Sequence, residues 1–172
     1  MNRRKLAAAA ALATVCVLAP TPAQAQNLQI TDPAGDAPSG GLDITAATVS
    51  NRDRAVVVRV SFERAMRGEL IVGVKARDGG RVVAVSEHRP LRGDRNFLFK
   101  PATGEKWDCR GFGVTWDHDS DTATVRLSSR CLDGGDYGAV RVFLLTEEAG
   151  GGADMDTAPE TATGWTKWIP RG

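Results

Sequence analysis

The chain has 172 residues, of which 42% are hydrophobic and 25% are charged, and its formal net charge is +1 at pH 7. Domains that bind nucleic acid usually carry a strong excess of positive charge, so this balance argues against nucleic acid as the main partner. The length allows one domain with a hydrophobic core.

The N-terminus has the three parts of a secretory signal peptide. Residues 2–5 are mostly basic, residues 6–18 form an alanine-rich apolar run, and residues 23–25 read Ala-Gln-Ala. We therefore expect residues 1–25 to be removed, leaving residues 26–172 as a single exported, extracellular domain. Its 19 basic and 21 acidic residues give a net charge of −2. The apolar run is shorter than the roughly 20 residues that a membrane helix needs, so we expect no membrane span.

Apolar residues alternate with polar ones along most of the mature chain, which is the pattern of half-buried strands. Short turn sequences such as Asp78-Gly79-Gly80 separate these runs. The pattern predicts an all-β fold, a single antiparallel β-sandwich of jelly-roll or immunoglobulin-like type with about eight or nine strands. The predicted strands include residues 42–50, 54–63, 69–77, 81–87, 96–100 and 139–146.

Two cysteines remain after the leader, which carries Cys16, is removed. Cys109 and Cys131 bracket a predicted hairpin whose strands include residues 112–116 and 125–127. In an exported chain we expect them to form a disulfide across the open end of this hairpin. The alternative is two buried free thiols.

Three aspartates lie among glycines and prolines just before the first predicted long strand: Asp32, Asp36 and Asp43. Calcium takes six to eight oxygen ligands, chiefly carboxylates and carbonyls, from loops that can turn their backbone inward. The stretch is therefore either a plain acidic turn or a calcium loop.

Residues 32–36 read Asp-Pro-Ala-Gly-Asp and residues 40–44 read Gly-Gly-Leu-Asp-Ile. This opening resembles that of calcium-binding β-sandwich modules, the DOMON-like and family-9 carbohydrate-binding-like domains found at the C-terminus of glucodextranases and amylopullulanases. The resemblance implies that Asp32, Asp36 and Asp43 bind a structural calcium ion. Ala37 stands where the family often has a second aspartate, and Ser39-Gly40-Gly41 replaces a Gly-Pro-Gly turn. The alanine-rich leader and the preference for Arg over Lys also resemble small secreted proteins of high-GC actinobacteria.

A second acidic run contains Asp117, Asp119 and Asp121. An EF-hand loop begins in this way, but it needs a glycine and an acid where this chain has Thr122 and Ser128. The run is either the solvated tip of a hairpin or a weaker second cation site. Asp154 and Asp156 form a similar, shorter pair.

The motifs of common hydrolases and nucleotide-binding enzymes are missing from the sequence. Ser86 and His88 share a strand face about 7 Å apart, too far for a nucleophile and its base. We expect His88 to be a surface or edge residue. His118 lies at the predicted hairpin tip and could at most help to bind a metal.

Four tryptophans are candidates either for the core or for stacking on sugar rings, whose apolar faces a flat indole can cover. Trp116 shares a face with core residues, and Trp165 and Trp168 would face opposite ways on a regular strand. Trp107 and Trp168 are the candidates for ligand stacking. The alternative is that all four are structural.

The sequence thus predicts a secreted, monomeric, non-catalytic binding domain with a structural calcium ion and a carbohydrate, cell-wall glycan or extracellular protein as its ligand. One alternative is a small secreted hydrolase that uses acidic residues. Another is an inhibitor or adhesion module.

Overall fold

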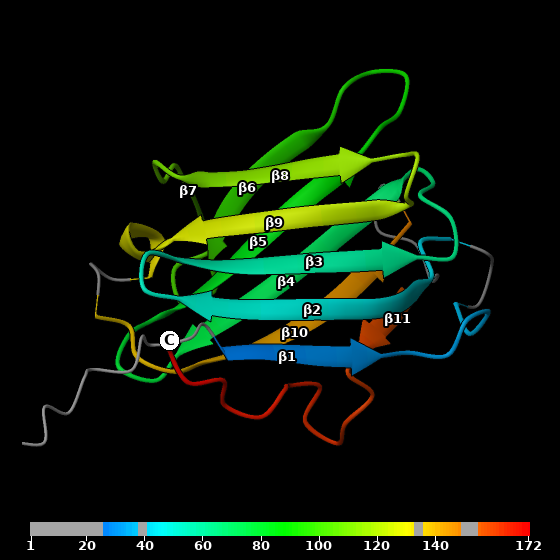
Figure 1. The fold of residues 1–172 in the computed structure, drawn as a ribbon. Helices are drawn as coiled ribbons and strands as arrows, with labels where there is room; N and C mark the ends of the chain where they lie inside the picture. Colours follow the sequence, from blue (N-terminus) through cyan, green and yellow to red (C-terminus); the bar gives the residue numbers. More distant parts are fainter. Residues whose placement is uncertain (1–25, 38–40, 133–135, 149–154) are drawn as a thin grey trace, which may run out of the picture.

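The computed structural model describes residues 26–37, 41–132, 136–148 and 155–172. Two antiparallel sheets face each other, and the strands of the rear sheet run diagonally behind those of the front sheet (Figure 1). The predicted all-β antiparallel sandwich is confirmed. The part of the chain that the structure describes contains no helix long and apolar enough to cross a bilayer.

The first sheet, in front in Figure 1, has five strands in the order β1-β2-β3-β9-β8. Its central hairpin is β2–β3, joined by a tight turn at residues 53–54. The strands of the first sheet are β1 (Gln26–Thr31), β2 (Ile44–Arg52), β3 (Ala55–Phe62), β8 (Phe112–Asp117) and β9 (Thr122–Ser128).

The second sheet has six strands in the order β11-β10-β4-β5-β6-β7. A short 3-10 helix, η1 (Ser129–Cys131), follows β9 and leads the chain toward this sheet. The strands of the second sheet are β4 (Gly68–Ala76), β5 (Arg81–His88), β6 (Arg95–Lys100), β7 (Glu105–Trp107), β10 (Val140–Glu147) and β11 (Met155–Ala158).

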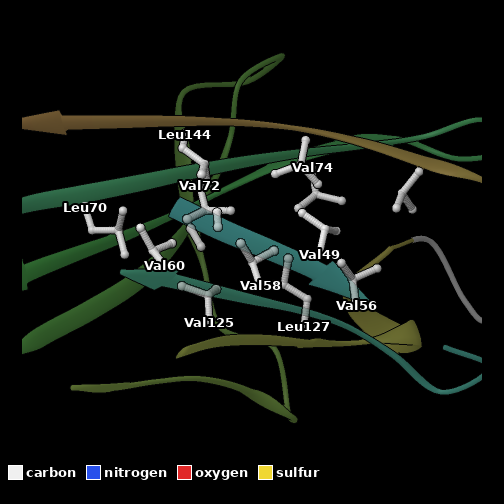
Figure 2. Close-up of a cluster of buried hydrophobic side chains, with 14 of the residues drawn as sticks. Val49, Val56, Val58, Val60, Leu70, Val72, Val74, Val125, Leu127 and Leu144 are labelled. Carbon is white, nitrogen blue, oxygen red and sulfur yellow. The ribbon is translucent and has the colours of Figure 1, made fainter. Parts of the chain in front are cut away.

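The core is built from alternate residues of the strands, those whose side chains face the other sheet. Most of these residues are valines and leucines (Figure 2). Val58 and Val60 of β3 and Val72 and Val74 of β4 have no exposed surface. Burying each such side chain stabilises the fold by about 1.5–3 kcal/mol relative to exposure. The alternation read from the sequence therefore places the residues that hold the two sheets together.

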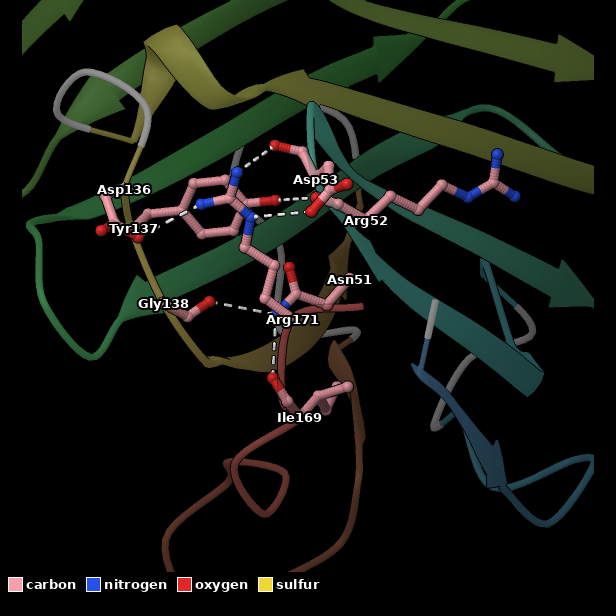
Figure 3. A network of polar contacts seen from close by, with 8 residues as sticks. All are labelled: Asn51, Arg52, Asp53, Asp136, Tyr137, Gly138, Ile169 and Arg171. Atoms are coloured by element: carbon pink, nitrogen blue, oxygen red, sulfur yellow. Dashed lines mark hydrogen bonds and ion pairs between the residues drawn. The ribbon is translucent and has the colours of Figure 1, made fainter. Parts of the chain in front are cut away.

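The C-terminal segment after β11 is not a regular strand, but it is fixed to both sheets. Ile169 forms an isolated bridge with Val140 of β10. The buried side chain of Asn51 donates from Nδ2 to the carbonyls of Ile169 (2.9 Å) and Gly138 (3.2 Å), as Figure 3 shows. Asn51 thereby joins the end of β2 to the approach to β10 and to the last residues of the chain.

Arg171 completes this junction (Figure 3). Its guanidinium lies over the ring of Tyr137, donates to the carbonyl of Asp53 (2.6 Å) and pairs with the carboxylate of Asp136 (3.3 Å). Tyr137 is fully buried and donates its hydroxyl to the carbonyl of Arg52. Burial is the main cause that raises the pKa of this phenol above its ordinary value. These contacts therefore fix the end of the chain to the β2–β3 turn and to the segment before β10.

The predicted disulfide is confirmed. Cys109 and Cys131 are bonded, with their Cα atoms 5.7 Å apart. The bond links the residue stretch before β8 to η1, at the open end of the β8–β9 hairpin. Such a bond indicates an oxidising compartment.

The structure has eleven strands among its described residues, so the predicted number of eight or nine is too low. The strands missing from the prediction are β1, β7 and β11. β1 and β7 expose most of their residues, and β7 and β11 have only three and four residues. Such strands carry little of the alternation that marks a strand in a sequence.

Candidate metal centre

The loop after β1 is folded onto the start of β2 by hydrogen bonds from its backbone amides. The amide of Asp32 donates to the carbonyl of Thr45 (3.0 Å). Gly35 has a φ of +84°, a conformation that favours glycine, and its amide donates to Oδ2 of Asp43 at 2.5 Å. The turn at Gly35 thus brings the carboxylates on either side of it back toward the body of the sandwich.

β11 supplies a third carboxylate from the opposite end of the chain. Asp156 faces the interior, is 6% exposed, and accepts a hydrogen bond at Oδ2 from the amide of Ile44 (2.6 Å). Ile44 begins β2 in the first sheet, whereas Asp156 belongs to the second sheet. Asp156 therefore connects the two sheets beside the acidic loop.

Asp32, Asp36 and Asp156 form an acidic cluster in which one carboxylate oxygen from each residue lies within 4.8 Å of the others. Calcium–oxygen bonds are about 2.3–2.6 Å long, so two oxygens on one ion can be up to about 5 Å apart. The cluster could therefore hold one metal ion. An all-carboxylate donor set suits a hard cation such as calcium.

The electrostatics of the acidic cluster are those of uncompensated negative charge. Burial raises the pKa of Asp32 from 3.8 to about 7, and the neighbouring carboxylates, Asp156 first, add to that rise. Burial also raises the pKa of Asp156, although its hydrogen bond from Ile44 opposes the effect. Oδ2 of Asp32 is buried and has no hydrogen-bond partner among the described residues. A bound cation would satisfy this oxygen and reverse the repulsion.

Asp43 was predicted as a ligand, but the structure does not include it in this group of three. It is 3% exposed, and its Oδ2 accepts the hydrogen bond from Gly35. Its Oδ1 is buried without a partner among the described residues. Asp43 therefore orients the loop and adds a negative charge close to the acidic cluster, as its effect on the pKa of Asp32 shows.

A cavity of about 240 Å³ lies beside this loop. Gly35, Asp43 and Met66 line it together with Glu63 and Arg64, which follow β3. The cavity therefore borders the loop on the side of Asp43, and the three residues of the acidic cluster are not part of its lining.

The second predicted site, at the β8–β9 turn, has a different arrangement. The carboxylate of Asp117 accepts from the amide of Asp119 (3.1 Å) and from the hydroxyl of Ser120 (2.7 Å). Hydrogen bonding to Ser120 lowers the pKa of Asp117. Asp121, whose φ is +48°, accepts from the amide of Ala65. The carboxylate of Asp117 is thus used within the turn and that of Asp121 holds the segment after β3, and the three acids do not form a metal group among the described residues.

His88 was predicted to be a surface or edge residue, and this is wrong. The side chain is fully buried between the sheets, where it stacks on Trp116 with ring centres 4.0 Å apart. Its Nδ1 contacts Oδ1 of Asp94 (2.9 Å), and its Nε2 has no partner among the described residues. Burial lowers the pKa of His88. The ring centre of His118 lies 4.9 Å from that of His88, but His88, His118 and Asp94 do not form a group that could hold a metal ion among the described residues.

Trp165 and Trp168 do not face opposite ways. Both lie over the outer face of the second sheet, because the segment that carries them is irregular rather than a strand. Arg141 contacts both rings, and Arg77 and Arg81 contact Trp168 and Trp165, with guanidinium carbons 4.9–5.2 Å from the ring centres. We call these five residues the arginine–tryptophan ladder.

The two candidates for sugar stacking are both half-buried. Trp168 has cations over its ring, and Trp107 has the Lys100 ammonium 4.6 Å from its ring centre. Trp107 also packs against the core, as does Trp116. Cations thus occupy the ring surfaces on which a neutral sugar would stack.

Sequence reasoning grouped Asp32 and Asp36 but paired them with Asp43 rather than Asp156. The signal for Asp156 was the short acidic pair in which it lies, whose other member, Asp154, is outside the described residues. Comparison with known protein families finds no matching family, and comparison with curated proteins finds no significant relative.

Proposed function

We propose that the chain is a secreted, non-catalytic β-sandwich domain that binds carbohydrate and is stabilised by a structural calcium ion. The observation that carries the metal part is the acidic cluster, whose members come from both ends of the chain and both sheets. Asp32, Asp36 and Asp156 would hold the ion, with backbone carbonyls and water completing its coordination. Asp43 would orient the loop through the hydrogen bond that its Oδ2 accepts from the amide of Gly35.

The ion would supply positive charge where carboxylates now repel each other. Its effect would be structural, because Asp156 is buried and the cluster joins β11 to the loop after β1. β1 is the edge strand of the first sheet and pairs only with β2 among the described strands. Holding its following loop would keep this edge strand in register.

Three observations support the binding role. The disulfide and the predicted leader favour an extracellular protein. The opening motif resembles carbohydrate-binding modules with this sandwich architecture. Finally, the sequence has no motif of a common enzyme class.

Thermal unfolding of the purified protein, first in EDTA and then in millimolar calcium, tests the metal site. At a calcium concentration 100-fold above the dissociation constant, binding adds about 2.7 kcal/mol, which corresponds to a rise in Tm of several degrees. The Asp156→Asn variant should lose this rise. Asp119→Asn, which removes an exposed acid at the β8–β9 turn, is the matched control and should keep it.

A Tm that does not respond to calcium in the wild-type protein would reject the metal site. A response that survives in Asp156→Asn would place the ion elsewhere. A glycan array probed with the same protein tests the ligand class separately, because its readout is independent of the change in Tm with calcium.

The runner-up function is a hydrolase, and one observation favours it. Glu69 and Glu87 are directly opposite each other on β4 and β5 and line a cavity of about 620 Å³. Side chains so placed can lie at the spacing of the two carboxylates in a glycosidase. Hydrolysis of a panel of chromogenic glycosides that is lost in Glu69→Gln and in Glu87→Gln would favour this function over simple binding.

A further inference from the structure

The outer face of the second sheet carries a row of positive charges at one end. Arg81, Lys75 and Arg141 are directly opposite one another in the register of β5, β4 and β10. Like charges directly opposite on neighbouring strands destabilise a sheet. Arg77, two residues beyond Lys75, extends the same outward-facing side. If no opposite charge compensates this row, repulsion between its members lowers the stability of the sheet. A bound anionic ligand would remove that repulsion.

Acidic side chains do not neutralise this row within the part of the chain that the structure describes. Arg77, Arg81 and Arg141 are absent from the ion pairs found there. Nε of Arg141 is buried and has no hydrogen-bond partner among those residues. Arg77 and Arg81 are exposed to solvent. The guanidiniums are thus held in place by rings rather than by carboxylates.

The ladder orients these guanidiniums. A guanidinium that stacks its flat face on an indole keeps its N–H groups in its own plane, where they can bind a carboxylate or sulfate with two parallel hydrogen bonds. Each ring lies about 5 Å from the guanidinium carbons on it, so neighbouring arginines of the ladder are at most about 10 Å apart.

We propose that the arginine–tryptophan ladder is a binding site for an acidic polysaccharide, one that carries carboxylate or sulfate groups on regularly spaced sugars. The inference rests on the proposed role in carbohydrate binding and names the ligand class. The polymer runs across β5, β4 and β10 rather than along them. Glu87, Glu69 and Glu147 form an acidic row at the other end of the same face, six residues along β4, which would repel a chain laid parallel to the strands.

Nucleic acid is a poorer fit to the same site. The charge of the mature domain is −2, whereas nucleic-acid-binding domains carry a broad positive surface. The positive charge of the arginine–tryptophan ladder lies at one end of one sheet face. The indole rings are also covered by arginines, so they are not open for stacking on bases.

The test measures binding of the purified full chain to polygalacturonate and to dextran sulfate by calorimetry, with tryptophan fluorescence as a second readout. Neutral dextran and a DNA duplex are the comparison ligands. We expect binding to at least one acidic polymer, weakening with added salt because exposed charges are screened. Replacing both Arg77 and Arg81 by Gln should weaken binding by about tenfold or more, since hydrogen bonds to charged groups are each worth about that much.

The matched control is the double variant Arg52→Gln and Arg126→Gln, which removes two exposed arginines of the first sheet. It should bind within about twofold of wild type, because salt screening confines the effect of a distant charge. The Tm of each variant shows that it is folded. If Arg77→Gln with Arg81→Gln lowers the Tm, the single variant Arg77→Gln, which leaves Arg81 on Trp165, should still weaken binding severalfold.

Equal binding by the ladder variants and wild type would overturn the proposal, as would preference for DNA over both acidic polymers. Binding of neutral glycans alone would overturn it while leaving the carbohydrate-binding role intact. Failure to bind any glycan would reject both, and the calcium measurement would still decide the metal site independently.

Discussion

Replacing Asp32 by Asn should stabilise the protein in the absence of metal, although it removes a charged group. Asp32 is half-buried, has an orphaned oxygen and lies among other carboxylates. Its pKa rises from 3.8 to about 7 on folding. The folded protein therefore holds a proton on Asp32 that the unfolded chain releases between about pH 4 and 7. The free energy of unfolding of the metal-free protein must then fall as pH rises through that window.

The size of this effect follows from the shift in pKa. A rise from 3.8 to about 7 corresponds to ~4 kcal/mol if no solvent screening acts. Asp32 keeps some contact with water, which reduces the value to about 1–2 kcal/mol. At pH 8 in EDTA, Asp32→Asn should thus be more stable than wild type by about 1–2 kcal/mol. Near pH 4 the two proteins should be nearly equal.

Urea unfolding at pH 4, 5, 6, 7 and 8 in EDTA measures this difference. His88 has a pKa lowered by burial, so it destabilises the fold as pH falls below about 6.5. It is present in both proteins, and the difference between their curves isolates Asp32. Asp119→Asn is the control for loss of a charge and should follow wild type. The reasoning is refuted if the wild-type protein gains stability relative to Asp32→Asn between pH 5 and 8 in EDTA. Calcium should reverse the order at pH 8.

Three further predictions concern the scaffold. Replacing Cys109 and Cys131 by Ser opens a loop with a sequence separation of 22 residues and should cost about 3 kcal/mol in urea unfolding; an unchanged midpoint would contradict it. In Gly73→Ala the new methyl would lie 1.8 Å from the Phe143 ring, so stability should fall by about 1–3 kcal/mol, whereas Gly113→Ala, with open space around it, is the control. Tyr137→Phe leaves a backbone carbonyl without its donor and should lower stability by about 1–2 kcal/mol, and a neutral result in thermal unfolding would show that water replaces the hydroxyl.

The sequence predicts the strands that form the core well, because they alternate strictly. The inward valines of β3 and the inward leucine and valines of β4 are read directly from this period. β1, β7 and β11 lie at the edges of the sheets, where one face or both are open to water. A strand without a buried face has no hydrophobic period, and its existence depends on a neighbour that the sequence does not reveal.

The acidic cluster is only partly predictable for the same reason. The spacing of Asp32 and Asp36 is local, so the loop is visible in the sequence. Asp156 arrives from β11 through the pairing of the second sheet, and its bond to Ile44 spans 112 positions. The prediction for His88 failed for a different reason, because a polar residue near a strand end is expected to be exposed. It is buried because the hairpin of β8 and β9 lays Trp116 over it.

The contacts that join the two ends of β2 to β11 and to the C-terminal segment have a consequence for the order of folding. Asn51 bonds to Ile169 across 118 positions, and Ile44 bonds to Asp156 across 112. During synthesis or transport from the N-terminus, β2 and β3 emerge long before these partners do. Contacts of such long range slow folding, and unpaired apolar strands are prone to aggregate while they wait. The nascent chain would therefore need protection until nearly all of it has emerged.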